Sequence, residues 1–111
     1  MVTVLETLES LAQMILDEGF VRSVRASNDE LGVVHLELIV DGSVGRDDVA
    51  RVVDDKGMVA HACKLSVERE KPVGNMKLIQ IAVGQHMPCG LKRTVTRVSK
   101  EPDAYFAPCQ P

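Results

Sequence analysis

Two closely spaced pairs of histidine and cysteine lie in the second half of the sequence. His61 and Cys63 are separated by one residue, and His86 and Cys89 are separated by two. Side chains two positions apart on a strand share a face, and a three-residue step in a loop can curl around an ion, so each pair could point toward one ion. Thiolate and imidazole are ligands that zinc prefers. If the two pairs converge, they form a four-ligand zinc site, in which Cys109 could replace one member.

The segment that carries His61 and Cys63 has a simpler interpretation. Val59, Leu65 and Val67 alternate in the same phase, and such a face is typical of a core strand. Free cysteine is among the most often buried residue types. Zinc frameworks usually contain two close cysteine pairs or a pair of histidines a few residues apart, which this sequence lacks. We therefore expect no cofactor and keep zinc as the alternative.

The run GQHMPCG is compatible with a reactive thiol or with a turn. Pro88 and Gly90 flank Cys89, so its thiol would be exposed, and His86 is close enough in sequence to accept its proton. Cys89 and His86 are thus the candidate catalytic pair. Alternatively, the run is a β-turn in which proline presets the backbone and Gly90 adopts a positive φ. The turn is favoured because no third residue is seen to orient the histidine, so catalysis is not the expectation.

Composition indicates one folded domain. The chain has 111 residues, of which 45% are hydrophobic and 26% charged, a balance typical of a folded protein with one core. We expect a single domain over residues 1–100 and an extended tail over 101–111. The net charge of −3, with both signs interspersed, predicts no binding to nucleic acid.

The apolar stretches and the cysteines predict a cytoplasmic location. The apolar stretches are short and interrupted by charges, and the first residues do not resemble a signal peptide. No membrane contact is therefore expected. Three cysteines at irregular positions argue against a disulfide framework and for reduced thiols.

Hydrophobic periodicity predicts a helix over residues 3–19, with one buried face. Thr3 and Glu6 have the spacing of a capping box, and Gly19 is placed to end the helix in a left-handed conformation.

Residues 20–26 and 32–40 predict an antiparallel hairpin. Both runs are rich in β-branched residues, and the loop between them has a length and composition typical of hairpin turns. In the second strand, one face holds apolar residues alone and should face the core. The core face is expected to hold Val34, Leu36, Leu38 and Val40, and the other face Val33, His35, Glu37 and Ile39.

The rest of the chain predicts a second helix over residues 46–57 and a second hairpin over 58–70 and 76–83. A last strand is expected over residues 91–98. The order is therefore helix, strand, strand, helix, strand, strand, strand. It predicts a two-layer α+β fold, with a mostly antiparallel sheet of about five strands and two helices on one face.

Two groups of charged residues have simple interpretations. Lysine and arginine on an edge strand prevent sheets from pairing with each other, and this is the role expected for the basic cluster on the last strand. His35 and Glu37 could form an acid–base pair, but a surface pair without a function is the expectation. The basic cluster consists of Lys92, Arg93, Arg97 and Lys100.

The sequence favours a non-catalytic protein that acts by binding or assembly. Two helices cover one face of a five-stranded sheet, so apolar residues on the other face, such as Val33 and Ile39, would need another surface. A second copy of the chain, or another protein, is the expected partner, and the interface is expected on the open sheet face or on a free strand edge. The competing hypothesis is a zinc or thiol-redox protein that uses His61, Cys63, His86 and Cys89.

Overall fold

The described elements follow one another in the predicted order. The computed structural model describes residues 3–55, 65–84 and 87–100. Along these segments lie α1 (Val4–Leu16), β1 (Val21–Asn28), β2 (Val34–Asp41), α2 (Arg46–Val53), β3 (Leu65–Val73), β4 (Met76–Val83) and β5 (Val95–Ser99). The order of two helices and five strands confirms the predicted α+β fold.

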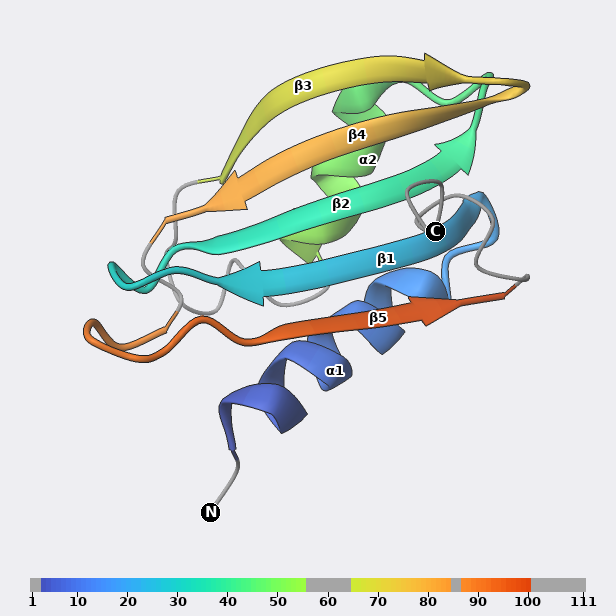
Figure 1. Cartoon of the computed structure of the whole chain (residues 1–111). Coiled ribbons are helices and arrows are strands. Elements are labelled where there is room, and N and C mark those ends of the chain that lie inside the picture. The colour runs from blue at the N-terminus through green and yellow to red at the C-terminus, as the bar shows by residue number, and fades with distance from the viewer. Residues whose placement is uncertain (1–2, 56–64, 85–86, 101–111) are drawn as a thin grey trace, which may run out of the picture.

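The five strands form one sheet in the order β3-β4-β2-β1-β5. Every neighbouring pair is antiparallel. Both helices lie behind the sheet in Figure 1, where α1 packs on β1 and β5 and α2 contacts β3. The predicted two-layer arrangement is therefore confirmed. The sheet surface that faces away from the helices is called the open face below.

The core lies between the sheet and the helices. The predicted core face of β2 is confirmed, because all four of its apolar side chains are fully buried. Leucine and isoleucine side chains of α1 and β4 pack against them. Burying one such side chain stabilises the fold by about 1.5–3 kcal/mol. The four β2 residues are Val34, Leu36, Leu38 and Val40.

The start of α1 follows the prediction, and its end does not. The Thr3 hydroxyl accepts a hydrogen bond from the Glu6 backbone N–H at 3.0 Å, as an N-cap does. The helix ends at Leu16, and Gly19 has no positive φ, so its predicted left-handed conformation is wrong. The chain instead turns through a bond from the Val21 N–H to the Glu18 carbonyl, which leads directly into β1.

The connection between β3 and β4 also lies later than expected. Val73 pairs with Met76, so the hairpin loop consists of Gly74 and Asn75. Gly74 has a φ of 60°, which suits glycine in a tight hairpin turn. Pro72, expected in the turn, belongs to β3, where a proline is tolerated because β3 is an edge strand.

Both edges of the sheet carry charges. The prediction that the last strand lies at an edge is confirmed by β5, on which Arg97 is exposed. At the other edge, β3 contains a run of exposed charged residues and a bulge between Val67 and Arg69. Charges, proline and bulges all disfavour pairing with a strand of another molecule. The edges are therefore poor surfaces for assembly.

Candidate functional site

Most of the predicted zinc and catalytic residues lie outside the part of the chain that the structure describes. His61, Cys63, His86 and Cys109 are outside, and Cys89 is inside. The convergence of the two His/Cys pairs therefore stays a prediction. Within residues 3–55, 65–84 and 87–100, no group of three or more His, Cys, Asp or Glu residues could hold a metal ion.

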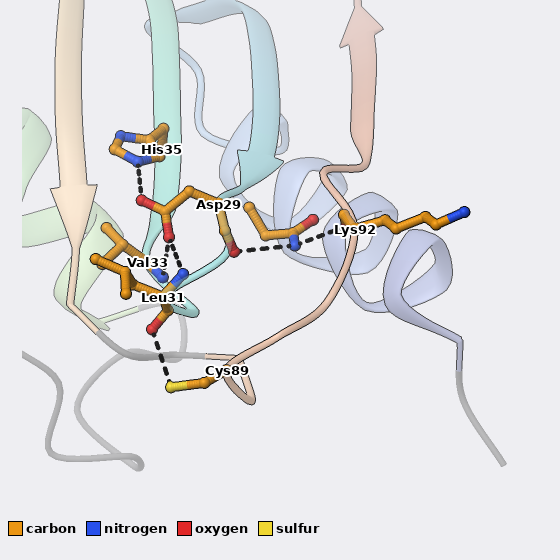
Figure 2. Close-up of polar contacts among 7 residues, drawn as sticks. Asp29, Leu31, Val33, His35, Cys89 and Lys92 are labelled. Atoms are coloured by element: carbon orange, nitrogen blue, oxygen red, sulfur yellow. Dashed lines mark hydrogen bonds and ion pairs between the residues drawn. The ribbon is translucent and has the colours of Figure 1, made fainter.

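Cys89 lies on a turn that packs against the β1–β2 loop. Its side chain is exposed, and the thiol donates to the Leu31 carbonyl at 3.5 Å (Figure 2). The Gly90 N–H donates to the Glu30 carbonyl at 2.7 Å, and Gly90 has a φ of 83°. The positive φ predicted for this glycine is confirmed, and the described part of GQHMPCG forms a docked turn.

Gly32 allows this close approach of the two loops. It has a φ of 82°, and an added Cβ would overlap the Met87 carbonyl oxygen. The Met87 N–H donates to the Gly32 carbonyl at 2.9 Å, and the Met87 side chain is buried. The turn that carries Cys89 is thus held against the end of the sheet where the β1–β2 loop lies.

The partner of His35 is Asp29, and not its strand neighbour Glu37. Figure 2 shows the His35 ring directed at the Asp29 carboxylate, with Nε2 2.9 Å from Oδ2. The other carboxylate oxygen accepts the N–H groups of Leu31 at 2.8 Å and Val33 at 3.1 Å. An aspartate side chain that accepts a hydrogen bond from the backbone N–H two residues later is a common turn motif. The Asn28-Asp29 pair was therefore the sequence feature that could have indicated this turn.

These contacts keep Asp29 ionised and orient the ring. The hydrogen bond from His35 above all, with the two backbone N–H groups, holds the pKa of Asp29 below its ordinary value of 3.8, against the opposing effect of burial. Because the carboxylate accepts, Nε2 carries the hydrogen. In the neutral ring, Nδ1 is then an acceptor, and it points away from Asp29 in Figure 2.

Glu37, the partner expected for His35, bonds to two other strands. On β1, Arg25 Nη1 lies 3.0 Å from Glu37 Oε1. On β4, Gln80 Nε2 lies 3.3 Å from Glu37 Oε2. The three residues are in register across the sheet, so these contacts fix their side chains on the open face. The predicted His35–Glu37 pair is therefore replaced by an Asp29–His35 pair and an Arg25–Glu37–Gln80 row.

A polar cleft of about 280 Å³ lies on the open face. Ser27, His35, Glu37 and Gln80 line it from β1, β2 and β4. The exposed side chains of Glu68 and Arg93 line it as well, from the β3 side and from the segment before β5. This cleft is the candidate functional site because polar groups from separate elements converge on it.

Comparisons with known protein families, curated proteins and solved structures find no match for this chain. The function must therefore be argued from the geometry of the cleft.

The cleft contains the residue types of a nucleophile, a base and an orienting carboxylate. Ser27 lies opposite His35 in the register of β1 and β2, and His35 bonds to Asp29. In the described part of the chain, however, no hydrogen bond joins the Ser27 hydroxyl to the ring, and the Ser27 side chain is buried. Activation of a serine requires that contact.

The apolar patch expected on the open face is smaller than predicted. Ile39 lies on this face by register, yet it is only 1% exposed, so the expectation that it needs another surface is wrong. Val33 is half-buried. Among the described residues, Val95 is a large apolar side chain that the register puts on the open face, and it is 43% exposed. The described helices are too short or too polar to cross a membrane.

Proposed function

We propose that the protein acts by reversible binding and holds a small polar ligand in the cleft on its open face. The observation that supports this function is the convergence of Ser27, His35, Glu37 and Gln80 on one cleft of about 280 Å³. Sites for small molecules are concave and use a few well-placed polar groups to orient the ligand.

The cleft side chains are ordered before any ligand arrives. His35 is held by Asp29, and Glu37 is held by Arg25 and Gln80. Ordering a flexible side chain on binding costs about 0.5–1.5 kcal/mol. Because these contacts already exist, that cost is reduced. The amide oxygen of Gln80 remains to accept a hydrogen bond from a ligand, and so does Nδ1 of His35 when the ring is neutral.

A fragment screen by NMR tests this function. Small polar compounds are added to 15N-labelled protein, and the shifted backbone signals are mapped onto the structure. We expect the shifts to cluster at His35, Glu37 and Gln80. Shifts that cluster elsewhere, or compounds that shift no signal of the cleft at millimolar concentration, would reject the proposal.

Self-association through the open face is the assembly we propose. The sheet edges are charged, and the helices occupy the other face. The open face carries both signs, with Arg25 next to Glu37, so it is electrostatically complementary to a second copy of itself. A second copy docked there would cover Glu37 and the cleft, so the dimer and the ligand-bound form exclude each other. Sedimentation between 1 and 100 micromolar should show a species of twice the 12.1 kDa chain mass. A monomer throughout that range would rule out this assembly.

The alternative function is a zinc or thiol-redox site that includes Cys89. Its support is the exposure of the Cys89 side chain on a turn. Reduced thiols would accord with the cytoplasmic location that we propose. Elemental analysis of protein purified without chelator, together with a count of reactive thiols, tests whether such a metal or thiol site exists. Near-stoichiometric metal would displace the ligand-binding proposal, and metal-free protein with slow thiols would remove the alternative.

A further inference from the structure

The charged side chains that line the cleft differ in whether they have an ion-pair partner within the described part of the chain. Asp29 pairs with His35, and Glu37 pairs with Arg25. Glu68 and Arg93, in contrast, have no hydrogen-bond or ion-pair partner for their side chains among the residues that the structure describes. One negative and one positive charge therefore remain available to a ligand.

Glu68 lines the cleft from β3, at a bulge that leaves it without a paired residue on β4. Val67 pairs with Ile81 and Arg69 pairs with Gln80, so Glu68 is the extra residue between two consecutive pairs. A bulge redirects the side chain of its extra residue and is frequent beside functional sites. Val67 packs against the core, so the alternation of side chains puts Glu68 on the open face, and after the bulge Arg69 lies opposite Gln80 on that same face.

The buried amide of Asn28 holds the segment that carries Arg93. The Asn28 side chain donates to the Lys92 carbonyl at 3.1 Å and accepts from the Thr94 N–H at 3.0 Å. Asn28 is fully buried at the end of β1. These two hydrogen bonds hold Lys92 and Thr94, which precede and follow Arg93 in the chain. They therefore fix the backbone of Arg93 beside the cleft.

Glu68 and Arg93 lie on opposite sides of the cleft. β4, β2 and β1 lie between β3 and β5 in the sheet. Arg93 precedes β5 directly, so four strand spacings of about 4.8 Å separate the two backbones, roughly 19 Å in all. Both long side chains reach inward from these positions, which leaves room for a ligand of about 7–10 Å between its charges. Two or three extended residues have that length.

We infer that the ligand is zwitterionic, a short peptide with free termini whose carboxylate meets Arg93 and whose ammonium meets Glu68. This inference rests on the proposed ligand-binding function. Between the two charges, His35 and Gln80 present hydrogen-bonding groups suited to peptide N–H and C=O groups. The two end charges are exposed, so binding should be weak and should weaken further with salt.

The test compares trialanine with its N-acetylated form and its C-terminal amide by NMR titration. The variants are Glu68→Gln and Arg93→Gln. The controls are Glu9→Gln on α1 and Lys92→Gln, which change exposed charges that do not line the cleft. Backbone spectra and thermal unfolding confirm that each variant is folded.

Each cleft variant should weaken trialanine binding about three- to fivefold, the effect of losing one exposed ion pair. Glu68→Gln should weaken the amide form, which keeps its ammonium, and should leave the acetylated form unchanged. Arg93→Gln should show the reverse pattern. The controls should leave all three affinities unchanged. This crossed pattern assigns each terminus to one residue.

N-methylacetamide, a neutral probe, separates the two proposals. If it or the blocked peptides shift the cleft signals and trialanine binds no more tightly, the zwitterion inference fails and the binding function stands. If no probe shifts the cleft, both fail. Equal weakening by the cleft and control variants would also overturn the inference, because it would show a general charge effect.

Discussion

The Asp29 carboxylate receives a hydrogen bond from His35 at 2.9 Å while its other oxygen bonds the backbone of its own loop. One side chain thus shapes the β1–β2 turn and orients a ring that lines the cleft. Local folding and the candidate site depend on the same residue.

Replacement of Asp29 should destabilise the fold. Asp29→Ala removes the bonds to Leu31, Val33 and His35, and we expect a loss of about 1–2 kcal/mol in the free energy of unfolding. Asp29→Asn retains an acceptor oxygen for the loop, so its loss should be smaller. Urea unfolding at pH 7 measures both. Equal losses for the two variants would show that the backbone bonds are unimportant.

The contribution of Asp29 should disappear in acid. Its pKa is lower in the folded protein than its ordinary value of 3.8, so the folded state favours the ionised form. The stabilisation is therefore present above about pH 4 and is lost as the pH falls through the lowered pKa. The difference in unfolding free energy between the natural chain and Asp29→Asn should shrink between pH 5 and pH 2. A difference that stays constant over this range would contradict the prediction.

Gly32 and Gly90 provide a matched pair of substitutions. Their φ angles are 82° and 83°, but a Cβ at Gly32 meets the Met87 carbonyl, whereas a Cβ at Gly90 meets open space. Gly90→Ala should cost about 1–2 kcal/mol from backbone strain alone. Gly32→Ala should cost more, since the two loops must also separate. Denaturant unfolding of the two variants compares these costs, and a smaller loss for Gly32→Ala would refute the close packing.

Asn28→Ala should affect both stability and binding. It leaves the Lys92 carbonyl and the Thr94 N–H without their side-chain partner at a buried position, at a cost of about 2–3 kcal/mol. Because Arg93 lies between these groups, the affinity for trialanine should fall as it does in Arg93→Gln. Calorimetry and NMR titration measure the two effects. An unchanged affinity in the folded variant would show that Asn28 does not position Arg93.

The elements and the core face were predictable from the sequence because both depend on local periodicity. The helical spacing of α1 and the apolar alternation of β2 each identify one buried face without knowledge of the neighbours. Hydrogen bonds between residues a few positions apart in the chain, such as the Thr3 cap on Glu6, were predictable for the same reason. Composition also indicated that β5, with its basic residues, would lie at an edge.

The cleft was not predictable because its contacts join residues that are distant in the chain. Glu37 meets Gln80 on β4, and Asn28 meets Lys92 before β5, only after the strand order and register are set. The bulge at Glu68 has no local signal in a run of charges. Local sequence therefore determined which residues form helices and strands and which faces are buried, while long-range pairing decided which polar side chains meet.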